Sequence, residues 1–380
     1  MSKSNKIFCT APFTTLRIEK TEKHGLVYKP GCVYKPVGEI PTLSDFMHGT
    51  EISELRDNVC NGDTFKDGCR MCSNSEKLGL RSIRMKMNEK SLFSDNLDIK
   101  LLDIAYSNIC NLGCLMCSPS SSSFLASERF QIGIVKEIQP YFDNTDYAIE
   151  AMDSLPNLES VSLIGGEFFI FKNNLIILDK IIEKQLQCRI VTNATIISDE
   201  LLSRLSQLGN KLELQISVDG SNECYEFMRY PAKWDVLKDN VIRLQKALPY
   251  AKMNFQIIVQ ALNIQHIPSS LSVLNEFRLP MSLQNLSDPS WLSWNILTDE
   301  EKCDLENHLM VELGTARITQ KQKNEILKFI DGIKLSSFNE RDRSYAIDTM
   351  RKTFHHRKLS NQVISKQLGI FHNLTKQLTS

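Results

Sequence analysis

The sequence predicts an α/β protein: six strand-helix units, a small cysteine-rich module before them and a helical region after them. From Lys100 onward, short apolar or β-branched runs alternate with longer runs of helical periodicity, a pattern typical of a parallel sheet. Cysteines are concentrated in short motifs before that region, and the last ninety residues have helical periodicity. We therefore expect three parts, covering residues 1–95, 96–290 and 291–380.

The composition is that of an ordinary globular chain without a dominant charge. Of 380 residues, 42% are hydrophobic and 24% are charged, and 45 Lys plus Arg balance 45 Asp plus Glu. Because no net field favours nucleic acid or a membrane surface, neither is expected as a partner. The chain starts without an apolar targeting segment, and no run approaches the ~18 apolar residues of a membrane helix. Its eleven cysteines, concentrated in short motifs, are typical of a protein in a reducing compartment. We expect a cytoplasmic protein.

The first ninety-five residues form a loop-rich, poorly cored segment that carries cysteines. A helix is predicted at Leu43–Asn58, with Glu54 and Arg56 on its polar side, and Lys86–Asn96 is predicted as a linker. Such a segment usually needs a metal, so we expect a closed four-cysteine site that holds zinc or an iron-sulfur cluster. Its ligands would be Cys9, Cys32, Cys69 and Cys72. Cys60 is expected to be a small buried filler.

The central part contains the six strand-helix units. Strands are predicted at Leu101–Ser107, Ser160–Ile164, Cys188–Thr192, Leu212–Val218, Met253–Gln260 and Met281–Leu286. Helices are predicted between them at Lys172–Gln187, Asp199–Leu208, Trp234–Leu248 and Pro268–Phe277. In such sheets ligands collect at the carboxyl ends of the strands.

Directly after the first of these strands, Cys110, Cys114 and Cys117 have the spacing C-x3-C-x2-C. Three soft thiolates on one short loop can close around a single metal site, and they are one ligand short of a closed four-iron cluster. The alternatives are a zinc site completed by a distant Cys or His and an electron-transfer cluster completed by a distant Cys.

Two further patterns lie at strand ends. The second strand is followed by Gly165, Gly166 and Glu167, where glycines allow close backbone approach and a carboxylate could accept hydrogen bonds from an ammonium group, although Gly-Gly-Glu alone is often only a turn. The fourth strand carries polar side chains in alternation up to Ser217, which predicts a hydrated ligand cavity. Asp219 beyond it is expected either to form a turn with an Asx hydrogen bond or to have a functional role.

The cysteine spacing, followed about fifty residues later by Gly-Gly-Glu at a strand end, resembles the radical SAM superfamily. The resemblance implies a partial (β/α)6 TIM-like barrel in which Cys110, Cys114 and Cys117 are the catalytic cysteines. They would hold a [4Fe-4S] cluster whose open iron binds S-adenosyl-L-methionine (SAM). Reduction of that cluster would cleave SAM to methionine and a 5′-deoxyadenosyl radical, which abstracts hydrogen from a substrate.

The same resemblance implies further SAM contacts. Gly-Gly-Glu would hold the methionyl amino group, and Met116 would pack near the adenine. Thr192 and Asn193 match a strand end seen in many members. Ser217 would contact the ribose or carboxylate of SAM, and Asn263 would approach the adenine.

The N-terminal module is similar to the twitch or SPASM-like modules that carry an auxiliary [4Fe-4S] cluster in many radical SAM enzymes. One departure is Gly31, which stands where a second adjacent cysteine often occurs. The matching residues are Cys9, Pro12, Phe13, Gly25, Val27, Pro30, Cys32, Leu55, Arg56, Cys69, Cys72, Glu76, Gly79, Ser82 and Arg84.

The C-terminal part is predicted to be helical at Thr298–Leu309, Thr319–Gly332, Glu340–Arg351 and Asn361–Leu374. After Asp348 the chain has no acid, and we expect its Lys and Arg side chains to be solvated. Arg229, in the central part, is also expected to be solvated. Cys188 and Cys224 are expected to be core residues.

Together these observations predict a radical SAM oxidoreductase that acts on a peptide, as many relatives with auxiliary clusters do. It would need a reductant of the flavodoxin or ferredoxin type. Modification of a sugar, nucleotide or other small molecule is the alternative among enzymes. A non-catalytic zinc or iron-sulfur scaffold or electron carrier is the alternative of another class.

Overall fold

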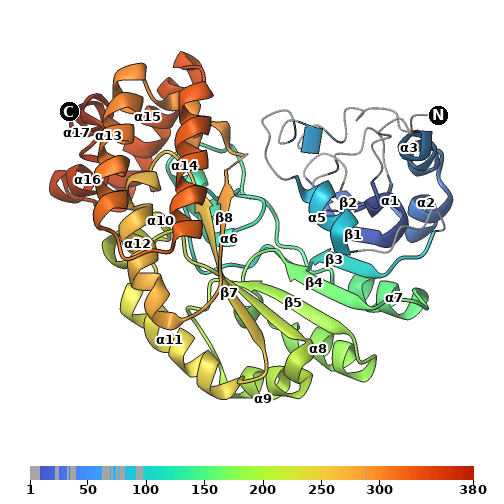
Figure 1. The fold of residues 1–380 in the computed structure, drawn as a ribbon. Coiled ribbons are helices and arrows are strands. Elements are labelled where there is room, and N and C mark those ends of the chain that lie inside the picture. The colour runs from blue at the N-terminus through green and yellow to red at the C-terminus, as the bar shows by residue number, and fades with distance from the viewer. Residues whose placement is uncertain are drawn as a thin grey trace.

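The computed structural model describes residues 9–21, 25–31, 34, 40–61, 69, 72–73, 76, 82–90, 97–286 and 288–380. One eight-stranded sheet runs through the molecule in the order β2-β1-β3-β4-β5-β6-β7-β8 (Figure 1). The strands are β1 (Thr15–Thr21), β2 (Gly25–Lys29), β3 (Leu101–Ala105), β4 (Ser160–Ile164), β5 (Gln187–Thr192), β6 (Leu212–Ser217), β7 (Lys252–Val259) and β8 (Met281–Asn285).

The α/β fold predicted from the sequence is confirmed. Strands β3 to β8 are the six predicted strands, and each pairs in parallel with the next. Two more strands come from the N-terminal segment, where loops and a helix but no strand were expected. Strand β1 pairs in parallel with β3, and β2 pairs antiparallel with β1. Leu16 and Ile18 are fully buried while Arg17 and Glu19 alternate with them, so this strand has the usual period of two.

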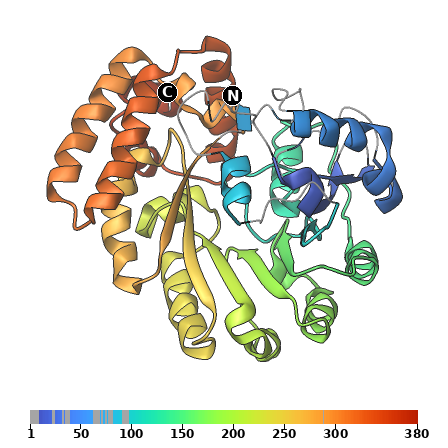
Figure 2. The same ribbon diagram turned by 45° about the vertical axis from the view of Figure 1, so that its right-hand side comes forward.

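The two faces of the sheet differ in polarity. One face is apolar and is covered by helices, with Val161, Cys188 and Ile190 among its buried side chains (Figure 2). The other face carries polar, partly exposed side chains, including Gln215 on β6 and Gln284 on β8. The predicted core position of Cys188, like that of Cys224, is confirmed.

Helices fill the remaining sequence, and none in the described part of the chain is long and apolar enough to cross a membrane. Two predicted helices are split at glycines: Gly49 separates α2 from α3, and Gly369 caps α16 before α17. Residues 86–90, expected in the linker, end helix α5, and residues 91–96 lie outside the described residues. The helices are α1 (Ala11–Thr14), α2 (Leu43–His48), α3 (Thr50–Asn61), α5 (Ile83–Lys90), α6 (Ser123–Gln131), α7 (Thr145–Ser154), α8 (Asn174–Glu183), α9 (Asp199–Leu208), α10 (Asn222–Met228), α11 (Trp234–Ala247), α12 (Ile267–Leu274), α13 (Asp299–Thr315), α14 (Gln320–Leu335), α15 (Glu340–His356), α16 (Asn361–Leu368) and α17 (His372–Thr379).

Two side-chain predictions for helix α3 were wrong. Arg56, expected on the polar side, is buried and donates to the carbonyl oxygens of Pro12 (2.9 Å), Met47 (2.8 Å) and Phe46 (3.1 Å). Cys60, expected to be buried, is exposed. The arginine can be buried because three carbonyl groups of helices α1 and α2 accept its hydrogen bonds.

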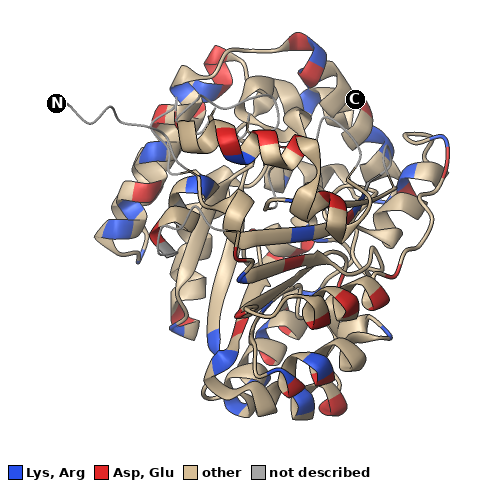
Figure 3. Ribbon diagram, turned by 90° about the vertical axis from the view of Figure 1, so that its right-hand side faces the viewer, with Lys and Arg blue, Asp and Glu red and all other residues tan. Residues whose placement is uncertain are grey.

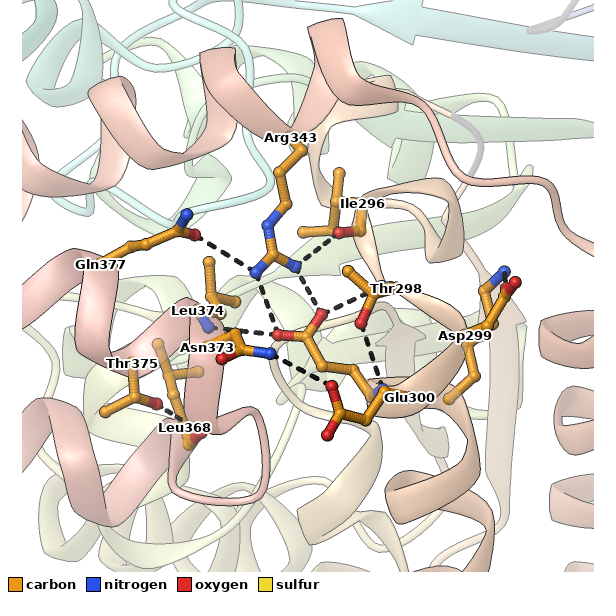
Figure 4. A network of polar contacts seen from close by, with 12 residues as sticks. Ile296, Thr298, Asp299, Glu300, Arg343, Leu368, Asn373, Leu374, Thr375 and Gln377 are labelled. Carbon is orange, nitrogen blue, oxygen red and sulfur yellow. Dashed lines mark hydrogen bonds and ion pairs between the residues drawn. The ribbon is translucent and has the colours of Figure 1, made fainter.

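The C-terminal helices are organised by a buried ion pair. Arg343 on α15 donates to Glu301 on α13 at 2.5 and 3.0 Å, and also to the carbonyl of Ile296 at 2.8 Å (Figure 4). Glu301 also accepts from the backbone nitrogens of Thr298 and Leu374, at 3.0 and 3.1 Å. One carboxylate thus joins the start of α13 to α15 and α17.

The basic side chains after Asp348 were expected to be solvated, and for Arg357 this is wrong. Its guanidinium is buried at the end of α15, donates to both carboxylate oxygens of Glu128 on α6 at 2.7 Å and reaches the Gly113 carbonyl at 2.5 Å. It also lies 4.7 Å from the centre of the Tyr230 ring. Elsewhere charges of both signs are interspersed over the outer helices (Figure 3). The C-terminal region is therefore joined to the cysteine loop by one arginine.

Replacing Arg357 with Met should destabilise the protein by about 3–5 kcal/mol, because Glu128 would remain buried without its cation. Chemical denaturation of the metal-free protein measures this loss. Lys352→Met on the same helix is the control, since Lys352 makes a half-exposed ion pair with Asp348 and should matter little. Equal stability of the two variants would contradict the predicted importance of the Arg357 pair.

Candidate active site

The loop that carries Cys110, Cys114 and Cys117 follows β3 and is fixed through its backbone. The nitrogens of Gly113 and Leu115 donate to the carbonyls of Tyr230 (2.7 Å) and Met228 (2.9 Å). Ser122 donates to the Leu112 carbonyl at 2.7 Å and caps helix α6, as expected for a serine-rich run before a helix. The loop is therefore held between α6 and the segment after α10.

The three thiols of this loop influence one another electrostatically. Burial and the neighbouring Cys114 raise the pKa of Cys110 to about 12, and burial with the charges of both other cysteines raises the pKa of Cys117. Burial also raises the pKa of Cys114. No group of three Cys, His, Asp or Glu side chains in the described ranges is already arranged around a metal position. The donor set is nevertheless that of a cluster site, because three thiols on one short loop become good ligands once a cation offsets their charge.

A buried ion pair lies beside Cys114. The Arg229 guanidinium contacts the Asp219 carboxylate at 2.6 Å and donates to Cys114 Sγ at 3.6 Å. Although burial opposes its charge, the carboxylate raises the pKa of Arg229, so the cation persists. Arg229 is 7% exposed, and the prediction of a solvated arginine was wrong. Its nonlocal partners have no signature in the sequence.

The two glycines after β4 pack against the start of the cysteine loop. A Cβ on Gly165 would lie 2.5 Å from the Ser107 carbonyl oxygen, and one on Gly166 would lie 2.0 Å from that of Ile109. The backbone nitrogens of Gly166 and Glu167 donate to those same carbonyls at 2.8 and 2.7 Å. Because these two positions have no side chain, the loop that carries the cysteines can pack directly against their backbone.

Glu167 connects the ends of β4 and β5. Its buried carboxylate accepts hydrogen bonds from Thr192 Oγ1 (2.6 Å), Asn193 N (2.6 Å) and Phe169 N (3.0 Å). Burial raises its pKa, and these hydrogen bonds oppose that rise. The Asn193 amide in turn donates to Asn111 Oδ1 in the cysteine loop at 3.0 Å. The predicted motif residues thus lie together in one hydrogen-bonded network.

The other predicted contact residues lie at the same edge of the sheet. Met116 in the loop and Ser217 at the end of β6 are partly exposed. Asn263 is fully buried: its amide donates to the carbonyls of Asp219 (3.0 Å) and Ile258 (2.8 Å), and its oxygen accepts from Gln260 N (2.9 Å). Its side chain therefore holds the loop after β7 to the loop after β6.

In the N-terminal module, Cys9 and Cys69 are partly buried and Cys72 is buried, whereas Cys32 and Gly79 lie outside the described residues. Burial and the charges of Cys69 and Cys72 raise the pKa of Cys9 to about 12. Arg84 donates to Glu76 at 2.9 Å, and Ser82 donates to the same carboxylate at 2.5 Å.

A protein-family model matches the part of the chain that contains this site. The model described as "Radical SAM superfamily" matches residues 104–272, from β3 to α12. These residues form a radical SAM superfamily domain. The domain contains the three-cysteine loop, the Gly-Gly-Glu turn and the network around Glu167. The superfamily is one of enzymes that use a [4Fe-4S] cluster and SAM.

No curated protein matches the chain in sequence. Similar solved structures include Streptococcus suis SuiB bound to precursor peptide SuiA, with 14% identity, TM-score 0.40 and coverage of 80% of this chain and 56% of that one. Native anSMEcpe with bound AdoMet has 16% identity, TM-score 0.42 and coverage of 67% and 66%. Methylornithine synthase (PylB) has 12% identity, TM-score 0.39 and coverage of 73% and 76%. The chain spans less than two thirds of the SuiB and anSMEcpe chains, and these low scores support no statement about substrate.

Gly166→Ala should destabilise the protein by about 1–3 kcal/mol, since the new methyl group would overlap backbone of the cysteine loop. The matched control is Gly314→Ala in α13, where a Cβ meets open space and should leave stability unchanged or slightly higher. Thermal and chemical denaturation of the two variants provide the comparison. If both retained full stability, the close packing of Gly166 on Ile109 would be refuted.

The raised thiol pKa values predict a pH dependence for the metal-free, reduced protein. Cys110 has an ordinary pKa of 9.0 and a folded pKa of about 12, so between these values the folded state holds a proton that the unfolded state has lost. The free energy of unfolding should therefore fall as pH rises through this window, by roughly 1 kcal/mol per thiol at pH 10.

Denaturation at pH 7 and pH 10 tests this dependence. A variant with Ser at positions 110, 114 and 117 is the control, because its hydroxyl groups do not titrate in this range, and it should lose less stability. An equal loss in both proteins would show that these thiols do not contribute.

Proposed function

We propose that this protein is a radical SAM oxidoreductase in which Cys110, Cys114 and Cys117 hold a [4Fe-4S] cluster. When bound and reduced, the cluster supplies the electron that cleaves SAM to methionine and the 5′-deoxyadenosyl radical that takes hydrogen from a substrate. The observation that carries the proposal is the three-thiol loop packed on the Gly-Gly-Glu turn within the matched domain. Ligands in parallel α/β sheets bind at this carboxyl edge.

The chain's own groups would divide the binding of SAM between them. Met116 and Ser217 are partly exposed at the sheet edge and are the side chains free to contact a ligand. The backbone of Gly165 and Gly166 packs against residues 107–109 at the start of the cysteine loop. Glu167 Oε2 accepts one hydrogen bond from the protein, which leaves it capacity to accept another from an ammonium group.

In this proposal, the roles of Thr192, Asn193 and Asn263 are to hold the strand ends in place. Their side chains are engaged in hydrogen bonds between strand ends, so they would fix the backbone that SAM contacts. A fixed polar edge costs no reorganisation when substrate arrives.

We also propose an auxiliary [4Fe-4S] cluster on Cys9, Cys32, Cys69 and Cys72. The burial of Cys72 and the partial burial of Cys9 and Cys69 in this small segment support a shared site, and zinc remains the rival occupant. The buried Arg56, which joins helix α3 to Pro12, supports a compact module around it.

For the substrate we propose a peptide. The polar face of the sheet supports a polar ligand: Gln215 donates to Gln256, Gln256 donates to Gln284 at 2.8 Å, and Gln215 and Gln284 are partly exposed. A sugar, nucleotide or other small molecule is the alternative substrate. The electron would come from a flavodoxin or ferredoxin type protein, and we place the enzyme in the reducing cytoplasm.

The test combines iron and sulfide analysis, Mössbauer spectra and dithionite-driven 5′-deoxyadenosine formation under anaerobic conditions. We expect about eight irons per chain, for two [4Fe-4S] clusters, and SAM cleavage. Cys117→Ala should abolish cleavage and leave about four irons in the N-terminal cluster. Cys188→Ala, at a buried cysteine remote from both sites, is the control that should retain cleavage.

Other outcomes would each change the proposal. About four irons with SAM cleavage would assign zinc or no metal to the N-terminal cysteines. Zinc alone, or iron without cleavage after reconstitution, would make the protein a scaffold or electron carrier. Retained 5′-deoxyadenosine production by Cys117→Ala would refute the assignment of the cluster ligands.

A further inference from the structure

Arg229 and Asp219 form a buried pair beside one cysteine of the loop. The carboxylate is fully buried, and the guanidinium contacts it at 2.6 Å. The guanidinium has one sulfur contact, to Cys114 Sγ at 3.6 Å, and its Nε is buried without a hydrogen-bond partner among the described residues. A full positive charge therefore lies against one prospective cluster ligand, away from bulk water.

Both members of the pair are held in place by backbone. Asp219 Oδ1 accepts from Ile258 N at 2.6 Å, and the carbonyl of Asp219 accepts from the Asn263 amide. On either side of Arg229, the carbonyls of Met228 and Tyr230 accept hydrogen bonds from the cysteine loop itself. The guanidinium and the loop thus keep a fixed spacing, which a flexible surface arginine would not provide.

We propose that Arg229 sets the reduction potential of the cluster by donating a hydrogen bond to the Cys114 sulfur, and that Asp219 limits this effect by partly balancing its charge. The inference rests on the proposed function, since it needs a cluster at these cysteines. Reduction adds one electron, supplied by dithionite in the test, and so adds one negative charge to the cluster. A nearby cation stabilises the more negative state more, and hydrogen bonds to cluster sulfurs have the same direction.

The first test is an EPR-monitored redox titration of the reconstituted protein without SAM, with the cluster signal of Cys110, Cys114 and Cys117 identified by its absence in Cys117→Ala. In Arg229→Gln the equilibrium constant for one-electron reduction should fall about tenfold, which is a shift of about 59 mV to lower potential. Arg229→Lys keeps the charge and should recover part of this shift. Arg243→Gln, a half-exposed arginine paired with Asp199, is the control and should titrate like the wild type.

The second test uses the carboxylate. Asp219→Asn removes the balancing negative charge and should raise the potential, opposite in sign to Arg229→Gln. Loss of a merely structural contact would not give opposite shifts in the two variants. If Arg229→Gln does not retain iron, the sign of the Asp219→Asn shift decides the proposal.

Unchanged potentials in both variants, or shifts of the same sign, would overturn the inference while wild-type SAM cleavage still upheld the proposed function. Failure of the proposed function has a separate signature, because the wild type would then show no reducible cluster at Cys110, Cys114 and Cys117 and no 5′-deoxyadenosine. The two failures are therefore distinguishable in one set of measurements.

Discussion

The architecture of the site depends on one close contact between backbones. The turn after β4 lies so near residues 107–109 that neither Gly165 nor Gly166 has room for a side chain. This contact brings the cysteine loop over the end of the neighbouring strand, where Glu167 then connects to Thr192 and Asn193 on β5. Parallel pairing of β3, β4 and β5 places all three strand ends at one edge of the sheet. The contact between the two glycines and residues 107–109 then fixes the loops at this edge relative to one another.

Buried ion pairs extend this arrangement to the rest of the chain. Glu128 with Arg357, Asp219 with Arg229 and Glu301 with Arg343 each join elements that are separate in the sequence. Buried pairs add little net stability over apolar packing, yet breaking one leaves an uncompensated charge. Their value here is geometric: two of the three pairs end in a hydrogen bond to the cysteine loop.

Periodicity in the sequence was sufficient to predict the six parallel strands and most helices, and the predicted helix starts at Thr298 and Thr319 are the N-cap residues of α13 and α14. The motif residues Cys110, Gly165 and Glu167 were also recognisable, because each follows a predicted strand. The strands β1 and β2 were missed because the segment was interpreted through its cysteines and turn residues. The buried positions of Arg56, Arg229 and Arg357 could not be predicted, since each depends on at least one partner far away in the sequence, such as Pro12, Cys114 and Glu128 respectively.

The contact between Arg357 and the Gly113 carbonyl has a consequence for biosynthesis, since 244 positions separate the two residues. At translation rates of about 5–20 residues per second, the cysteine loop waits roughly 10–50 s after its own synthesis for this partner. During that interval the nascent loop has its thiols without the guanidinium that will later cover Gly113. The cysteine loop therefore reaches its final packing only after nearly the whole chain has been made, and until then its three thiols lack this covering side chain.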